Sequence, residues 1–112
     1  MSETVKGLKL IVTVVDRGKG KAIVAAYHRC GVTYHQICLG RGTAKTELLE
    51  RLGLGHRERE VIFSLAENDC VPEIMDMLNK EMDFKKPGRG VAFTIPLASV
   101  GGSAALKCFL DK

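Results

Sequence analysis

The sequence predicts an α+β fold in which one strand–helix–strand unit is written twice. The first unit runs from an alternating apolar segment at 8–15, through a helix near 17–30, to a strand at 32–39. The second repeats this order at 59–66, 69–83 and 91–97. Two such units give the order βαββαβ, which is a ferredoxin-like sandwich: a four-stranded antiparallel sheet with two helices on one face.

The composition indicates one domain over residues 1–112. A chain of 112 residues with 46% hydrophobic composition can bury a single small core, which oligomerisation would help to complete. Its longest apolar run, at 10–15, is far shorter than the roughly 20 residues of a membrane helix. The first residues also lack the features of a signal peptide, so we expect a cytoplasmic protein without membrane insertion.

Charge and cysteine content bear on which ligands and partners the chain can have. The net charge of +4 permits contact with small anions but is too modest to indicate a nucleic-acid partner. The four cysteines form no C-x-x-C pair, and the three histidines complete no zinc-ligand spacing. We therefore expect reduced, mostly buried thiols and no metal site.

The first strand is apolar on both faces and is predicted to be central. Leu10, Val12 and Val14 alternate with Ile11 and Val15. The set that contains Leu10 is expected to lie in the core, together with Val61, Phe63, Leu65, Val91, Phe93 and Ile95. The second set is assigned to the open sheet face and predicts burial against other subunits; it comprises Ile11, Val15, Ile37, Leu39, Ile62 and Ala92.

The first helix has recognisable start and stop signals. Asp16 is expected to cap it, and Gly31 to end it in a left-handed conformation. The spacing i, i+3, i+4, i+7 predicts one buried stripe, formed by Ile23, Ala26, Tyr27 and Cys30.

The second unit follows the same logic. Asn68 or Asp69 is expected to cap its helix, with Pro72 in the first turn. The predicted buried stripe contains Val71, Ile74, Met75, Leu78 and Met82. Pro96 should end the last strand or mark an edge position, because proline cannot donate to a strand ladder.

Two segments are candidates for function. The connection at 40–57 is too long for a tight hairpin, and we expect a helical turn over 45–52 within it. The basic glycine loop at 85–91 opens into the last strand and is a candidate anion site. The alternative for the 40–57 connection is a surface loop without a ligand, and the alternative for the 85–91 loop is a tight turn. The basic segment 17–21 is read as solvated lysines rather than an anion site, and His35 as a structural histidine.

The sequence lacks the residues that other proteins of this fold use for their functions. An RNA-recognition module needs exposed aromatic residues on the central strands, and a metal carrier needs C-x-x-C in the first loop. No nucleophile or acid–base pair stands at a suggestive spacing, so we do not expect an enzyme.

The doubled unit, the long connection after the second strand and the G-x-G-x-x-F segment at 88–93 together resemble the PII signalling proteins. The resemblance runs from Leu8 to about Gly102, as to a divergent member. It implies a homotrimer that binds an adenine nucleotide (ATP, ADP or AMP) between subunits and senses nitrogen, carbon or energy status. It further implies control of a target transporter, enzyme or regulator through the 40–57 loop, and Mg²⁺ and 2-oxoglutarate as ligands.

Carried over residue by residue, the resemblance implies a set of site residues. Thr33 would contact the base. The family's T-loop begins where Gly40, Arg41 and Gly42 stand, and Arg41 would meet phosphate. The family's B-loop, whose backbone approaches phosphate, corresponds to Gly88, Arg89 and Gly90, with added charge from Lys86.

The departures from the family pattern bear on function. Arg89 stands where the B-loop has an aspartate, and Val91 where it has a phosphate-gripping lysine. The 40–57 loop is shorter than usual and has no tyrosine for nucleotidylation, and the C-terminal extension at 98–112 lacks the family's arginine pair. The alternative function is therefore a trimeric interaction or scaffold protein that has lost nucleotide binding.

Overall fold

The computed structural model describes residues 2–4, 7–41 and 58–102. Their elements follow the predicted order, with a short strand added at each end. The bounds are β1 Ser2–Thr4, β2 Leu8–Asp16, α1 Gly20–Arg29, β3 Tyr34–Arg41, β4 Glu58–Glu67, the 3-10 turn η1 Asn68–Cys70, α3 Val71–Lys80, β5 Val91–Pro96 and β6 Ser99–Gly101.

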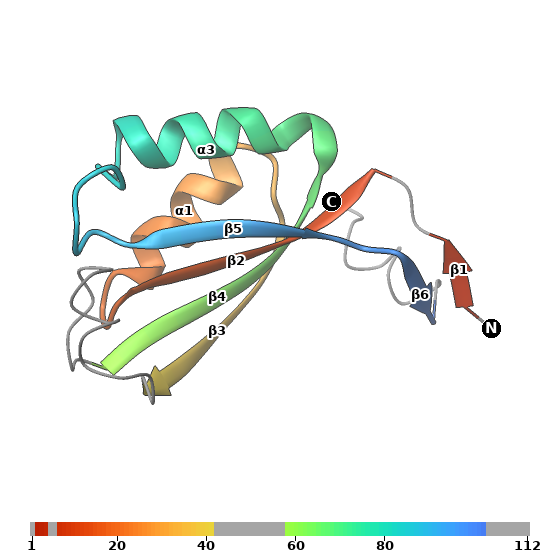
Figure 1. The fold of residues 1–112 in the computed structure, drawn as a ribbon, viewed down its shortest axis with the longest axis horizontal. Helices are drawn as coiled ribbons and strands as arrows, with labels where there is room; N and C mark the ends of the chain where they lie inside the picture. Colours follow the sequence, from red (N-terminus) through yellow and green to blue (C-terminus); the bar gives the residue numbers. More distant parts are fainter. Residues whose placement is uncertain (1, 5–6, 42–57, 103–112) are drawn as a thin grey trace.

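The main sheet has four strands in the order β3-β4-β2-β5, and every neighbouring pair is antiparallel. Helices α1 and α3 cover one face of it (Figure 1). This is the predicted ferredoxin-like arrangement. The first predicted strand, β2, is central as expected, and Pro96 ends β5 at an edge of the sheet.

The core lies between the sheet and the helices. Its most buried hydrophobic sheet residues are Ile11, Val15 and Ile62, at 0%, 1% and 0% exposure. The predicted helix stripes meet them, with Ile23, Ala26, Tyr27, Ile74 and Leu78 all buried.

The predicted assignment of the two sheet faces is wrong. Ile11, Val15, Ile62 and Ala92 pack toward the helices, whereas the set with Leu10 and Phe93 lies on the open face. Phe93, Ile95 and Val91 are 46%, 45% and 36% exposed. The reason is physical: a period of two shows which residues share a face, but when both faces are apolar it cannot show which face the helices cover.

Both predicted helix caps are also wrong. The N-cap residue of α1 is Lys19 and that of α3 is Cys70, and neither makes a side-chain capping bond. Asp16 pairs instead with Arg59, and the chain passes through η1 before α3. The stop signal is confirmed, because α1 ends before Gly31, whose φ is +90°. Pro72 lies in the first turn of α3, as predicted.

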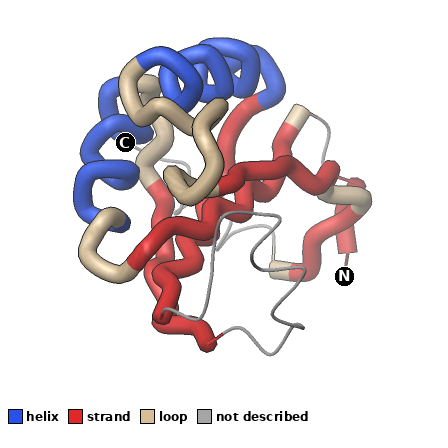
Figure 2. Tube along the Cα trace, turned by 60° about the vertical axis from the view of Figure 1, so that its left-hand side comes forward, coloured by secondary structure: helices blue, strands red, loops and turns tan. Residues whose placement is uncertain are grey.

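A second, two-stranded sheet lies apart from the main one. In it β1 pairs with β6, and Glu3 stands opposite Val100 (Figures 1 and 2). The sequence analysis did not anticipate this pair. It includes part of the 98–112 extension; the rest of that extension, and the helical turn predicted at 45–52, lie outside the described residues.

Candidate functional site

Five segments of the chain meet at one end of the main sheet. The strand register places Asp16 beside Arg59, Arg41 beside Glu58 and Val14 beside Val91. The end of β2, the end of β3, the start of β4 and the loop into β5 therefore share this end, and α1 starts there as well (Figure 1). The base of the 40–57 connection and the basic glycine loop are therefore at the same end of the sheet.

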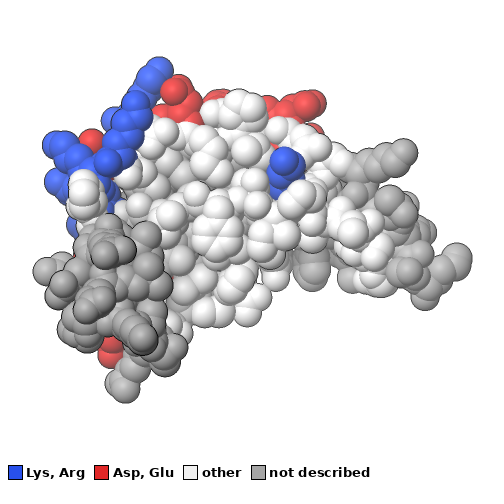
Figure 3. Space-filling view, in the orientation of Figure 1, with Lys and Arg blue, Asp and Glu red and all other residues white. Residues whose placement is uncertain are grey.

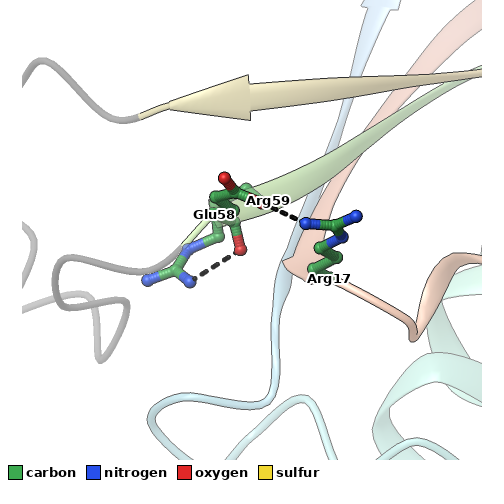
Figure 4. Close-up of polar contacts among 3 residues, drawn as sticks. All are labelled: Arg17, Glu58 and Arg59. Atoms are coloured by element: carbon green, nitrogen blue, oxygen red, sulfur yellow. Dashed lines mark hydrogen bonds and ion pairs between the residues drawn. The ribbon is translucent and has the colours of Figure 1, made fainter.

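Ion pairs hold this end of the sheet together. Arg59 is 4% exposed, and its Nη1 lies 2.7 Å from Oδ1 of Asp16. Arg17 pairs with Glu58 at 2.6 Å (Figure 4). Each pair joins β2, or the turn after it, to β4. They fix the two central strands relative to each other at the end of the sheet where the 40–57 connection begins and ends.

A third carboxylate anchors the helix. Oε1 of Glu60 accepts a hydrogen bond of 2.7 Å from the backbone N–H of Gly20. A Cβ atom at position 20 would lie 2.6 Å from that oxygen, so a side chain there would push the carboxylate away from the amide. Asp16, Glu58 and Glu60 are thus engaged in structural contacts. Sequence reasoning missed this group, because its partners lie about 40 residues apart in the chain.

The glycine loop is tightly wound. Gly88 has a φ of +85° and Gly90 a φ of +143°. A Cβ atom on Gly90 would lie 2.7 Å from Cζ of Phe84 and 2.9 Å from Cγ1 of Val15. Lys86 pairs with Asp83 at 3.1 Å, and its backbone N–H donates to the Asp83 carbonyl. Gly90 therefore has a packing role whatever the loop binds.

Basic side chains gather on this loop. Lys85, Lys86 and Arg89 are exposed there, and Lys19 and Lys21 are exposed at the start of α1. The space-filling view shows Lys and Arg concentrated at this end of the molecule (Figure 3). The surface is positive where the glycines bring the backbone close to solvent, which suits an anion.

The predicted site residues fall into two groups at opposite sheet edges. Gly40 and Arg41 end the edge strand β3, and Lys86, Gly88, Arg89 and Gly90 precede the other edge strand, β5. The two edge strands are three strand spacings of about 4.8 Å apart, so the groups are separated by roughly 14 Å. Gly42 and the side chain of Arg41 lie outside the described part of the chain.

Thr33 is apart from both groups. It precedes β3, so the whole length of that strand, about 26 Å at about 3.3 Å per residue, lies between it and Arg41. Within one copy of the chain, Thr33 and Arg41 cannot contact the same small ligand.

The polar residues under the helices are structural. Thr13 and Tyr27 share a hydrogen bond of 2.6 Å, and burial raises the pKa of Tyr27 to about 12. His35 contacts Oγ of Ser64 and the Val32 carbonyl oxygen, both at 3.1 Å. Burial lowers the pKa of His35 below its ordinary value. Both ring nitrogens of His35 are thus engaged within the fold, as expected of a structural histidine.

Cys30, Cys38 and Cys70 are free thiols, half-buried rather than buried as predicted. Over 2–4, 7–41 and 58–102, no group of three His, Cys, Asp or Glu side chains could hold a metal ion. No described helix is long and apolar enough to span a membrane.

No protein-family model and no curated protein sequence matches the chain. Solved structures do match it. CutA from Synechococcus elongatus PCC7942 has a TM-score of 0.69 at 8% identity, over 99% of this chain and 96% of that one. CPII from Thiomonas intermedia K12, bound to ADP, AMP and acetate, has a TM-score of 0.64 at 15% identity, over 87% and 91%.

Arabidopsis thaliana PII bound to citrate has a TM-score of 0.61 at 13% identity, over 82% of this chain and 78% of that one. At these identities the likeness concerns the fold. It extends over most of the chain in each case. The chain therefore has the PII-like fold that the PII and CutA proteins share.

Proposed function

We propose that the chain is a PII-like regulatory protein of the cytoplasm. It binds an adenine nucleotide or a related small anion in clefts between subunits and controls a partner through the 40–57 connection. The observation that carries this proposal is the placement of the basic glycine loop at the same end of the sheet as the base of that connection. The CPII structure with ADP and AMP supports nucleotides as the ligand class.

The open sheet face supports a homotrimer. It carries rows of apolar residues from β4, β2 and β5, in which Phe63, Val12 and Phe93 stand side by side. Phe93 is 46% exposed in the single chain. Large exposed apolar surfaces mark interaction sites. Stacking of this face against other copies would bury it.

A trimer would also assemble the site. The two groups of site residues stand roughly 14 Å apart at the sheet edges, and Thr33 lies at the far end of β3. A neighbouring subunit would bring Thr33 to the base of the nucleotide, while Arg41 and the glycine loop meet its phosphates.

The mechanism would be a population shift rather than catalysis. Bound ligand would favour one arrangement of the 40–57 connection, which then presents or withdraws a surface for a transporter, enzyme or regulator. Mg²⁺ and 2-oxoglutarate are further ligand candidates. The carboxylates at this end are engaged with Arg17, Arg59 and the Gly20 amide, which fits a non-enzymatic role.

Isothermal titration calorimetry tests this function, with ATP, ADP and AMP as ligands in the presence and absence of Mg²⁺ and 2-oxoglutarate. Light scattering gives the number of subunits. We expect saturable binding to a trimer. Arg89→Ala should weaken binding roughly tenfold, because it removes a charge-assisted contact. Lys9→Ala, on β2 away from the loop, is the matched control and should bind normally.

Two observations favour a second candidate, a trimeric scaffold that has lost nucleotide binding. Gly90 is already required by its packing against Phe84 and Val15. Val91, which replaces the family's lysine, pairs with Val14 within the sheet. A trimer that binds none of the nucleotides would contradict the first proposal and favour this one.

A further inference from the structure

A cavity of about 250 Å³ lies on the helix side of the sheet, between the start of α1, the end of α3 and the loop into β5. Its floor is made by Val15 and Ile23, which are 1% and 2% exposed. Met82 and Phe84 line it as half-buried walls. The interior is therefore apolar and formed by residues that the fold already holds in place.

The mouth of this cavity is positively charged. Lys19 and Arg89 line it and are exposed, and neither forms an ion pair within the described residues. Glu81 also lines it, but its Oε1 is paired with Nη2 of Arg29 at 3.0 Å. The carboxylate of Glu60 already accepts from the Gly20 amide at the start of α1, so the positive charge of the mouth comes from the side chains of Lys19 and Arg89.

We propose that this cavity binds a small amphiphilic carboxylate, at a site that differs from the proposed nucleotide cleft although Arg89 borders both. The carboxylate would sit at the mouth between Lys19 and Arg89, and an aromatic or short aliphatic body would fill the space against Phe84 and Ile23. An apolar cavity of about 150 Å³ accommodates benzene, so 250 Å³ suits a body of roughly ten non-hydrogen atoms.

The cavity is too small to enclose a whole nucleotide. Pockets for ligands of drug size measure about 300–1,000 Å³, and this one is smaller. Its lining comes from one copy of the chain, on the face covered by helices. Besides Arg89, which borders the cavity as well, the nucleotide cleft proposed above depends on Arg41 and on a second subunit.

Titration of the ¹⁵N-labelled protein with sodium benzoate, followed by amide chemical shifts, tests this site. We expect saturable shifts at Ile23, Phe84 and Gly90, with a dissociation constant in the millimolar range that suits so small a ligand. Benzyl alcohol, which has a similar body without the charge, should bind more weakly.

Two variants localise the binding. Lys19→Met should weaken benzoate roughly three- to tenfold, because it removes one cation from the mouth. Lys21→Met is the matched control: Lys21 is exposed on the same helix but does not line the cavity, so affinity should not change. Ala22→Phe adds bulk at an exposed lining position and should abolish binding without unfolding the chain.

Three results would overturn the inference. They are the absence of saturable shifts at the three amides, equal weakening by Lys19→Met and Lys21→Met, and equal affinity for benzyl alcohol and benzoate. Absence of nucleotide binding in the calorimetric experiment leaves this test unaffected, so the two proposals fail independently.

Discussion

At Gly90 both the backbone conformation and the surrounding side chains disfavour any residue other than glycine. Its φ of +143° disfavours any residue with a side chain, and a Cβ atom there would clash with Phe84 and Val15. The sequence marked this glycine as part of an anion loop; its packing role depends on Phe84 and on Val15, from β2, and could not be inferred from the G-x-G pattern.

We predict that Gly90→Ala lowers the free energy of unfolding by about 2–4 kcal/mol, from backbone strain and overpacking together. Gly18 isolates the first of these effects, because its φ is +93° but nothing lies within 4 Å of a Cβ there. Gly18→Ala should therefore cost only about 1 kcal/mol. Urea denaturation measures both, and equal losses would contradict the packing argument.

His35 gives the stability a pH dependence. Burial lowers its pKa in the folded state below the value of about 6.5 that it has when unfolded. The unfolded chain therefore binds the proton more readily. The contribution of this residue is fully present above pH about 6.5 and decreases as the pH falls toward its folded pKa.

The urea midpoint of the protein should thus fall between pH 7.5 and pH 5. In His35→Gln the fall should be smaller, because that proton is no longer taken up on unfolding. An unchanged slope in the variant would mean that other groups cause the pH dependence.

At the level of elements, β2 and β4 are joined by two ion pairs of different exposure. In the Asp16–Arg59 pair the side chains are 27% and 5% exposed, and in the Arg17–Glu58 pair they are 63% and 42% exposed. The sequence placed Asp16 at a helix cap, because its local pattern fits that role. The buried guanidinium from β4, 43 residues away, takes the carboxylate instead.

Asp16→Asn should destabilise the fold by about 2–4 kcal/mol, since it leaves the buried charge of Arg59 without its paired carboxylate. Glu58→Gln should cost less than about 1 kcal/mol, because the pair that it breaks is exposed. Thermal or urea unfolding distinguishes them. Similar losses in both variants would show that burial does not decide the strength of these pairs.

At the level of the whole molecule, the open sheet face should determine assembly. Phe93→Glu places a charge among Val12 and Phe63 and should convert a trimer to monomers. Ala25→Glu, on the exposed side of α1, is the control and should assemble normally. Light scattering on both variants gives the subunit number. Assembly that survives Phe93→Glu would place the subunit contact elsewhere.

The sequence predicted the architecture better than the orientation of its parts. Strong alternation at 8–15 and 59–66 located the central strands to within two residues. It could not assign their faces, because both are apolar. The β1–β6 pair could not be predicted either, since three-residue strands show no periodicity. Thr33 matched a family motif locally, but the length of β3 places it about 26 Å from Arg41.

The central position of β2 also affects how the chain is made. Its two neighbours, β4 and β5, are both encoded later, and Leu10 pairs with Leu65 and with Ile95. During synthesis the apolar strand therefore emerges long before its partners, and the sheet closes only when nearly all the described chain has left the ribosome. Such distant pairing slows folding and exposes the nascent strand to aggregation. Chaperone demand should consequently be highest late in translation.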